Sequence, residues 1–220
     1  MIIAIDGPAA SGKSTLARAL ASRLGLTFLD TGAMYRAVTL AALERGVAPS
    51  DGDGCAALAA TVALGFDDRG QVSIDGRPGE PAIRGADVTA NVSEVAAHSG
   101  VRRALVESQR AVARAASEGG GGVVAEGRDT TSVVFPGAHL KVFLLASPAV
   151  RALRRATEEG RPELAATYEA DLARRDAHDS QREDSPLVEV EDAVRVDTDT
   201  LTAEQVLERV AELAIARRPG

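Results

Sequence analysis

The segment that most constrains this chain lies close to its N-terminus and reads Gly7-Pro8-Ala9-Ala10-Ser11-Gly12-Lys13-Ser14. The apolar run Ile2-Ile3-Ala4-Ile5 precedes it and is typical of a buried strand. After it, leucines recur at helical spacing until Gly25 ends the pattern. A loop of this spacing between a strand and a helix matches the Walker A phosphate-binding motif. The alternative is a glycine-rich turn that fits the motif by chance.

The residue types of this loop suit a polyphosphate. Several backbone N–H groups can converge on one anion because glycine lets the chain approach closely, and the helix N-terminus adds partial positive charge. Lys13 would place an ammonium group against the outer phosphates, and the Ser14 hydroxyl is a ligand for Mg²⁺. Lys13 and Lys141 are the only lysines among 25 basic residues. We therefore predict that the loop, extended to Thr15, binds ATP.

The rest of the chain alternates between short apolar runs and helical patterns. The runs at 26–29, 123–125, 141–145 and 194–196 are predicted to be strands, and a helix is predicted over 35–43. Thr202 and Gln205 have the spacing of a capping box at the start of a last helix. This alternation predicts an α/β fold, with a parallel five-stranded sheet flanked by helices.

The middle of the chain has a different character. Residues 62–66 and 71–75 are predicted to be strands joined by a hairpin-type connection, and residues 76–85 are rich in glycine and proline. We interpret residues 62–90 as a small β-containing insertion into a core formed by residues 1–61 and 91–220. Within that core, the highly charged stretch at about 155–187 is predicted to be exposed and to form a short lid.

Composition and charge argue against several other classes of protein. The net charge of −7 argues against a protein that wraps a nucleic-acid duplex, because such proteins carry a basic surface. The single cysteine, Cys55, cannot form an internal disulfide, which fits a reducing cytoplasm. Asp6 interrupts the N-terminal apolar run, so we expect no signal peptide, and no run approaches the length of a membrane span. The only asparagine is Asn91, so the guanine-reading Asn-Lys-x-Asp segment of a switch GTPase is missing.

Arginines indicate a second anion site. Arg36 follows the second predicted strand, and Arg128 follows the third. Both positions fall at the carboxyl edge of a parallel sheet, where ligands bind, and a guanidinium group suits phosphate oxygens. Arg175, Asp179 and Arg182 have the spacing of one helical face. They can be a surface salt-bridge ladder or part of a mobile lid that brings arginines over the transferring phosphate.

With these segments in view, the chain resembles the bacterial cytidylate kinases nearly from end to end. The resemblance is carried by the phosphate loop together with Asp30-Thr31-Gly32-Ala33-Met34-Tyr35-Arg36, Ala125-Glu126-Gly127-Arg128-Asp129, Val133-Val134-Phe135-Pro136, Arg175-Asp176 with Asp179 and Arg182, Pro186-Leu187 and Asp192-Ala193. It implies transfer of a phosphoryl group from ATP to CMP or dCMP with Mg²⁺, and it implies that the middle insertion belongs to the monophosphate-binding domain.

The resemblance also implies roles for single residues. Thr31, Tyr35, Arg36 and Arg128 would hold the acceptor phosphate, and Ser93, Arg102, Asp129 and Arg182 would read the cytosine. Arg175 and Asp179 would reach the ribose and close the site, while Arg154 would lie near the adenine of ATP. The residues implied to act in catalysis are Lys13, Arg128, Arg175 and Arg182.

The chain departs from the family pattern at three positions. Thr131 stands where the family more often has glycine, Leu145 stands where it often has threonine, and Thr31 replaces a frequent serine. The first two departures put the loop shape beside Asp129 in question rather than the reaction. UMP is the nearest rival acceptor, and a non-catalytic ATP-binding module is the alternative of another class. We expect a cytoplasmic monomer whose partners are nucleotides, with no nucleic-acid or membrane partner.

Overall fold

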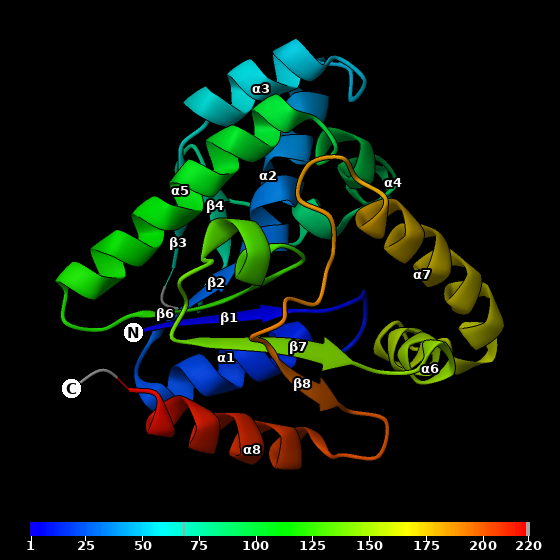
Figure 1. Cartoon of the computed structure of the whole chain (residues 1–220). Helices are drawn as coiled ribbons and strands as arrows, with labels where there is room; N and C mark the ends of the chain where they lie inside the picture. The colour runs from blue at the N-terminus through cyan, green and yellow to red at the C-terminus, as the bar shows by residue number, and fades with distance from the viewer. Residues whose placement is uncertain (68, 219–220) are drawn as a thin grey trace. The chain divides into compact units, whose positions relative to one another are not determined.

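The computed structural model describes residues 1–67 and 69–218 of the chain. It divides into two compact units (Figure 1). The first, called unit 1 here, consists of Met1–Thr27 and Ala116–Gly220, and the second, unit 2, consists of Phe28–Ala115.

A parallel sheet forms the centre of unit 1. Its strands are β1 (Ile2–Asp6), β6 (Val123–Gly127), β7 (Leu140–Leu145) and β8 (Val194–Asp197), and β2 (Thr27–Asp30) begins at the last residue before unit 2. The strand order is β2-β6-β1-β7-β8, and β1 pairs in parallel with both β6 and β7. Ile3 and Ile5 of β1 are fully buried, as expected of a central strand covered on both faces. The predicted α/β class and five-stranded parallel sheet are confirmed.

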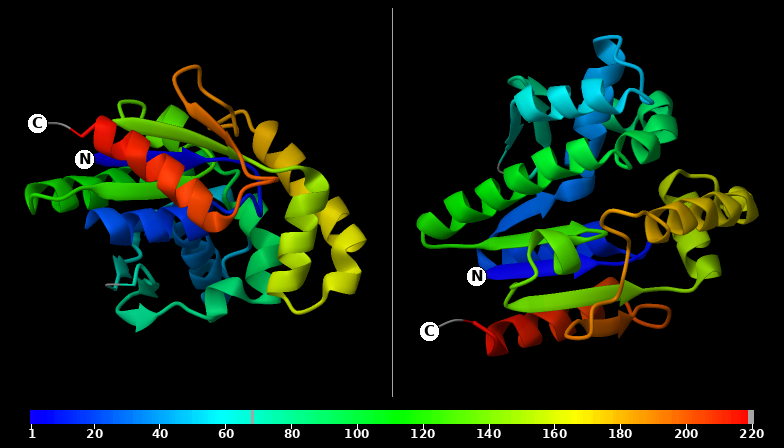
Figure 2. Two further views of the ribbon diagram at one scale, coloured as in Figure 1. Left: turned by 90° about the horizontal axis from the view of Figure 1, so that it is seen from below. Right: turned by 45° about the horizontal axis from the view of Figure 1, so that its top comes forward.

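The helices of unit 1 bring distant segments to the sheet. Helix α1 (Lys13–Leu24) contacts β6, β1 and α8 (Ala203–Ala216). The capping box predicted at the start of α8 is confirmed, since the Thr202 side chain accepts from the backbone of Gln205 and the Gln205 side chain accepts from Thr202 N. Helix α6 (Pro148–Glu158) and helix α7 (Ala165–Ser180) lie side by side, joined by the short turn η3 (Pro162–Leu164) (Figures 1 and 2).

Unit 2 is built around α2 (Thr31–Glu44), which packs against α3 (Gly52–Thr61), α4 (Ala86–Val95), the turn η1 (Ala82–Arg84) and strand β4 (Val72–Ile74). Strands β3 (Leu64–Phe66), β4 (Val72–Ile74) and β5 (Arg77–Pro78) form an antiparallel sheet, which confirms the two strands predicted near these positions. The long helix α5 (Ser99–Glu118) ends in unit 1. The division into a core and an insertion at 62–90 stays a prediction.

The prediction that a helix begins at residue 35 was wrong by four positions. Helix α2 begins at Thr31, directly after strand β2. Asp30 has extended backbone angles, and its carboxylate accepts a hydrogen bond from Ala33 N at 2.8 Å. An aspartate at this position satisfies an amide that the first helical turn leaves unpaired, so strand and helix follow one another without a loop.

Within residues 1–67 and 69–218, no helix combines enough length with enough apolar character to cross a bilayer.

Candidate active site

The phosphate loop runs from the end of β1 to the start of α1. Gly7 has a φ of +152°, and a Cβ there would stand 2.1 Å from the carbonyl oxygen of Leu144 in the neighbouring strand. Gly12 has a φ of +94° in the left-handed region and directly precedes the first helical residue, Lys13. Lack of space therefore requires glycine at position 7, and the left-handed backbone favours it at position 12, so that the loop stays close to the sheet edge.

Lys13 is buried at the base of this loop, with 5% of its surface exposed. Its Nζ donates to the carbonyl oxygen of Pro8 at 2.7 Å. Burial lowers the pKa of Lys13 to about 7, and the positive charge of Arg128 adds to this effect while Glu126 opposes it. An ammonium group held in such a place has lost its water and is suited to a strongly charged anionic partner.

Ser14 lies next to a carboxylate from the neighbouring strand. Its hydroxyl donates to Glu126 Oε1 at 2.6 Å, and Glu126 belongs to β6, which pairs with β1. The two residues offer oxygen atoms of the kind that Mg²⁺ prefers. Throughout the part of the chain that the structure describes, no group of three or more His, Cys, Asp or Glu side chains could hold a metal ion.

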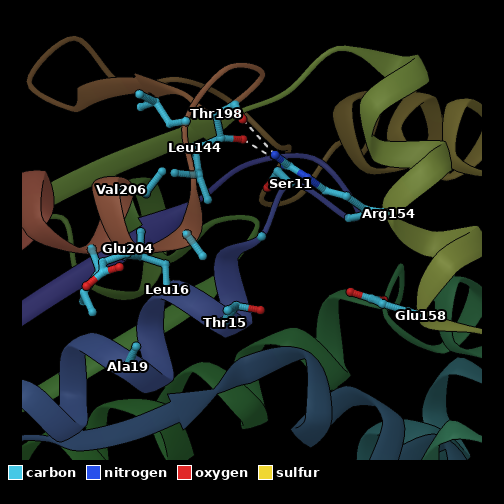
Figure 3. A pocket seen from close by; sticks show the side chains of 15 residues that line it. Ser11, Thr15, Leu16, Ala19, Leu144, Arg154, Glu158, Thr198, Glu204 and Val206 are labelled. Carbon is cyan, nitrogen blue, oxygen red and sulfur yellow. Dashed lines mark hydrogen bonds between the residues drawn. The ribbon is translucent and has the colours of Figure 1, made fainter.

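A cavity of about 470 Å³ opens beside the phosphate loop (Figure 3). This volume falls in the range of small-molecule sites. The cavity is lined by the loop, by α1 and α6, by the end of β7 and by the start of α8, through Ala10, Ser11, Gly12, Thr15, Leu16, Ala19, Leu144, Arg154, Glu158, Thr198, Leu201, Ala203, Glu204, Val206 and Leu207. Its walls are mainly apolar, with a few polar groups that can fix an orientation.

Arg154 is held in this cavity by the segment that follows β8. Its two terminal nitrogens donate to Thr198 Oγ1 at 2.9 Å and to the Thr198 carbonyl oxygen at 2.8 Å (Figure 3). Thr198 Oγ1 in turn donates to the carbonyl oxygen of Leu145 at 2.9 Å. The guanidinium plane is thus fixed at the wall, where a flat ring could contact it.

A cluster of opposite charges lies beside Lys13. Arg128 Nε donates to Asp179 Oδ2 at 2.8 Å, and Arg182 pairs with the other carboxylate oxygen of Asp179. Burial disfavours the charge on Asp179, but the two arginines outweigh it and hold its pKa below the ordinary value. Burial lowers the pKa of Arg175, and the charge of Arg128 lowers it further. The structure therefore brings Lys13, Arg128, Arg175, Asp179 and Arg182 together.

This cluster contradicts the surface-ladder interpretation for one residue of the charged stretch, while the mobile lid stays a prediction. Asp179 is only 5% exposed, and it joins α7 to the end of β6 rather than to its own helix alone. The simple surface ladder was therefore wrong for Asp179, because one of its two arginine partners is Arg128, which directly follows β6. The expectation of one helical face was also wrong for Arg182, since α7 ends at Ser180.

A second contact joins α7 to the phosphate loop itself. Asp176 Oδ1 accepts from the backbone N–H of Ala9 at 2.9 Å, and Arg151 donates to the carbonyl oxygen of Ala9 at 3.1 Å. Asp176 and Arg151 also form an ion pair with each other. The peptide groups on both sides of Ala9 are therefore held by side chains from α6 and α7.

Of the other predicted site residues, five lie in unit 2. Thr31, Tyr35 and Arg36 belong to the start of α2, while Ser93 lies in α4 and Arg102 in α5. Arg36 donates to Thr89 Oγ1 at 3.0 Å and to the carbonyl oxygen of Ile83 at 3.2 Å. The Arg102 guanidinium lies 5.2 Å from the ring centre of Tyr35. Unit 2 therefore brings Tyr35 and Arg102 together, and it ties Arg36 to η1 and α4.

Asp129 lies in unit 1 and is buried where β6 leads into the short turn η2 (Thr130–Val134). Thr131, which stands where the family more often has glycine, is also fully buried. Its hydroxyl and its backbone N–H both donate to Asp6 at 2.7 Å. The departure at position 131 therefore supplies a side-chain hydrogen bond, and the loop beside Asp129 is tied to β1.

Several residues of this site were not singled out from the sequence. Glu126 and Asp176 stood only within the segments of the family resemblance, and Arg151 and Thr198 were not considered. Each acts across a long separation; Ser14 and Glu126, for example, are 112 positions apart. No local spacing could have revealed such pairs, although a buried charged residue at the end of a strand is a general signal for a site.

A parallel sheet whose first strand leads into this loop, with a buried lysine and a cavity beside it, defines a P-loop nucleotide-binding protein. The family model described as Cytidylate kinase matches residues 3–216. The chain therefore belongs to the cytidylate kinase family.

Similar proteins agree with this assignment. A cytidylate kinase from Streptomyces griseus is 45% identical, covering 99% of this chain and 94% of its own. One from Geobacillus sp. is 43% identical, covering 98% and 96%. A bifunctional pantoate ligase/cytidylate kinase from Synechococcus sp. is 46% identical over 96% of this chain, but this chain spans only 44% of that protein's length. A sugar kinase from Janibacter sp. aligns with a TM-score of 0.49 and 17% identity, a likeness too weak to bear on function.

Proposed function

We propose that this protein transfers the γ-phosphoryl group of ATP to CMP or dCMP, giving ADP and CDP or dCDP. The observation that carries the proposal is the buried cluster in which Lys13 of the phosphate loop stands beside Arg128, itself held by Asp179. A bare nucleotide-binding loop has no need of arginines from two other elements. The similar proteins named cytidylate kinase support CMP as the acceptor.

The donor site is assigned to the loop and the cavity beside it. The backbone of Gly7 to Thr15 would hold the phosphates of ATP, and the adenine would enter the cavity against Arg154. Support comes from the cavity's volume of about 470 Å³ and from its mainly apolar lining. The bonds from Arg154 to Thr198 keep the guanidinium at the wall.

The acceptor site is assigned through the family resemblance. Thr31, Tyr35, Arg36 and Arg128 are proposed to hold the phosphate of CMP, and Ser93, Arg102, Asp129 and Arg182 to contact the cytosine, with Arg175 and Asp179 near the ribose. The burial of Thr31, Tyr35, Arg102 and Asp129 supports these roles, since a ligand site usually contains a few polar side chains held in fixed positions.

The proposed mechanism relies on alignment and charge neutralisation. The acceptor phosphate is already an anion, so the reaction has no obligatory general base. Lys13, Arg128, Arg175 and Arg182 would stabilise the negative charge on the transferring group. The side chains of α7 would exclude water, because an open site would lose ATP to hydrolysis.

The donor set fits a magnesium ion carried by the nucleotide. The Ser14 hydroxyl would be a direct ligand, and Glu126, which accepts its hydrogen bond, would orient it or hold a metal-bound water. When bound, the ion would draw charge from the phosphate oxygens. A site with so few protein ligands suits Mg²⁺, which usually keeps several waters and phosphate oxygens around it.

A broader pyrimidine monophosphate kinase that also accepts UMP is the nearest alternative. A non-catalytic ATP-binding module is the alternative of another class, and it leaves the cluster of Lys13, Arg128 and Asp179 without a purpose. That the protein acts as a monomer in the cytoplasm, without nucleic-acid partners, stays a prediction.

The proposal is tested by measuring ADP release with CMP, dCMP, UMP and AMP as acceptors. We expect CMP and dCMP to be used and the Lys13→Ala variant to lose at least about a hundredfold in kcat with its fold intact. The other lysine provides a control, because Lys141 lies near the N-terminal end of β7, at the edge of the sheet opposite the phosphate loop, and pairs with Asp192. Lys141→Ala should therefore stay active. Near-normal turnover of Lys13→Ala, or no acceptor-dependent ADP release by the wild type, would contradict the proposal.

A further inference from the structure

The carboxylate of Asp6 is fully buried at the end of β1. Its Oδ1 accepts from Thr130 N at 3.0 Å and from Thr130 Oγ1 at 2.7 Å. Its Oδ2 accepts from Thr131 N and from Thr131 Oγ1, both at 2.7 Å. Each carboxylate oxygen thus receives one backbone and one hydroxyl donor, from two consecutive residues more than 120 positions away along the chain.

The two hydroxyl donors matter because a buried carboxylate is stable only when its oxygens are satisfied. Burial raises the pKa of Asp6, while the bonds from Thr131 and Thr130 oppose that rise by favouring the ionised form. The backbone donors would exist with any residue at 130 and 131, but the hydroxyls depend on threonine. They are therefore the part of the arrangement that a substitution can remove without changing the backbone.

These bonds hold a segment that carries proposed acceptor groups. Arg128 and Asp129 directly precede Thr130, and Asp6 directly precedes Gly7 of the phosphate loop. The carbonyl oxygen of Asp129 accepts from Val133 N at 2.9 Å and from Val134 N at 3.1 Å. The short Arg128-Asp129 segment is therefore fixed between the end of β6 and the turn η2, and η2 is anchored to β1 through Asp6.

We infer that Asp6, Thr130 and Thr131 are positioning residues for phosphoryl transfer, which hold Arg128 and Asp129 in register with the phosphate loop. The inference rests on the proposed function and extends it to three residues that need not touch a nucleotide. One carboxylate joins the start of the donor loop to the segment with the acceptor groups. A misplacement of about 1 Å in such a segment can reduce the rate about a hundredfold, because the reacting groups must be aligned.

The test compares variants that keep or remove a hydroxyl. Thr131→Val has nearly the same shape but lacks the donor to Asp6, and Thr131→Ser keeps the donor while losing a methyl group. For Thr131→Val we expect kcat/KM for CMP to fall about tenfold, as for the loss of one hydrogen bond to a charged group. The dissociation constant for ATP, measured by calorimetry, should stay within about twofold of the wild type, since the loop's own amides are untouched. Thr131→Ser should recover most of the activity.

Two further variants separate positioning from simple stability. Val210→Ala removes buried volume from the second half of α8, beyond the residues of this helix that line the cavity, so it should lower the melting temperature without changing kcat/KM for CMP. Thr130→Val removes the hydroxyl donor to Asp6 Oδ1, so the inference can still be tested if Thr131→Val does not fold. The inference is overturned if the folded valine variants keep kcat/KM for CMP within about twofold of the wild type, or if Thr131→Ser loses as much as Thr131→Val. Absence of CMP-dependent activity in the wild type would instead reject the proposed function.

Discussion

At the scale of single residues, the protonation state of Lys13 matters most for the binding of ATP. Burial lowers its pKa to about 7, and the neighbouring Arg128 guanidinium contributes. The phosphates of ATP would bring negative charge against Nζ and favour the ammonium form. The pKa of Lys13 should therefore rise towards its ordinary value of 10.5 when ATP binds.

This shift predicts that ATP binding takes up a proton at pH 8. There the free protein holds Lys13 mostly neutral, while the complex holds it charged, so binding should weaken by up to tenfold per pH unit above about 7. Calorimetry in two buffers with different ionisation enthalpies measures the uptake. The Lys13→Ala variant should lack it, and an equal heat of binding in both buffers for the wild type would contradict the prediction.

Other residues show why local patterns revealed only part of the site. The phosphate loop was recognisable because its residues are consecutive and its function depends on backbone geometry. Glu126 and Asp176 carry no such local signature, because their partners Ser14 and Ala9 lie 112 and 167 positions away. Their roles depend on which strands and helices become neighbours.

At the scale of elements, the contact between α7 and the phosphate loop is expected to affect both the stability of the chain and the binding of ATP. Asp176 accepts from Ala9 N and pairs with Arg151, and both side chains are largely buried. The stretch at 155–187 was predicted to be charged and exposed. Much of it is, but one face of α7 places carboxylates against the loop and against Arg128.

We predict that Asp176→Ala lowers the free energy of unfolding by about 2 kcal/mol and weakens ATP binding, because Arg151 and the Ala9 amide lose their acceptor. The melting temperature should fall by about 4–8 °C in a chain of this size. Asp176→Asn should have a smaller effect, since its oxygen can still accept from Ala9. Differential scanning calorimetry and ATP titration measure both quantities.

Helix α7 itself offers a matched control. Asp171 pairs with Arg174 on the exposed side of the same helix, and exposed pairs contribute little. Asp171→Ala should therefore change the free energy of unfolding by less than about 0.5 kcal/mol. An equal loss in the Asp171 and Asp176 variants would show that helix content, rather than contact with the loop, decides the outcome.

Not every element was predictable. The strands of the sheet were expected near their observed places because short apolar runs bounded by turn residues are typical of buried strands. Helix α3 (Gly52–Thr61) was not expected, since glycines at 52 and 54 disfavour a helix. Asp51 overcomes this by accepting from Gly54 N at 2.9 Å, and Cys55 and Leu58 are buried on one face.

At the scale of the whole molecule, the proposed donor and acceptor residues are distributed over two compact units. The phosphate loop and the cavity belong to unit 1, whereas Thr31, Tyr35, Arg36, Ser93 and Arg102 belong to unit 2. Hydrogen exchange can follow the two nucleotides separately, because each should slow the amides that it orders or covers.

We predict that ATP alone slows exchange in residues 7–15 and 198–207, and that CMP alone slows it in residues 31–36 and 89–102. Mass spectrometry of peptide fragments, with and without each nucleotide, measures the protection. The Lys13→Ala variant should lose most of the protection by ATP and keep the protection by CMP. Protection by CMP that is confined to unit 1 would contradict the roles assigned to Arg36 and Arg102.

The sequence by itself determined the phosphate loop, the α/β class and the family. These depend on consecutive residues and on short periodic patterns, which the linear order of the chain contains. Only the tertiary structure decided that Asp6 binds Thr130 and Thr131, that Asp179 joins Arg128 to α7, and that Asp176 holds Ala9. Parallel strands need long crossover connections, so residues that meet at one sheet edge are far apart in sequence, and their contacts appear only when the sheet is assembled.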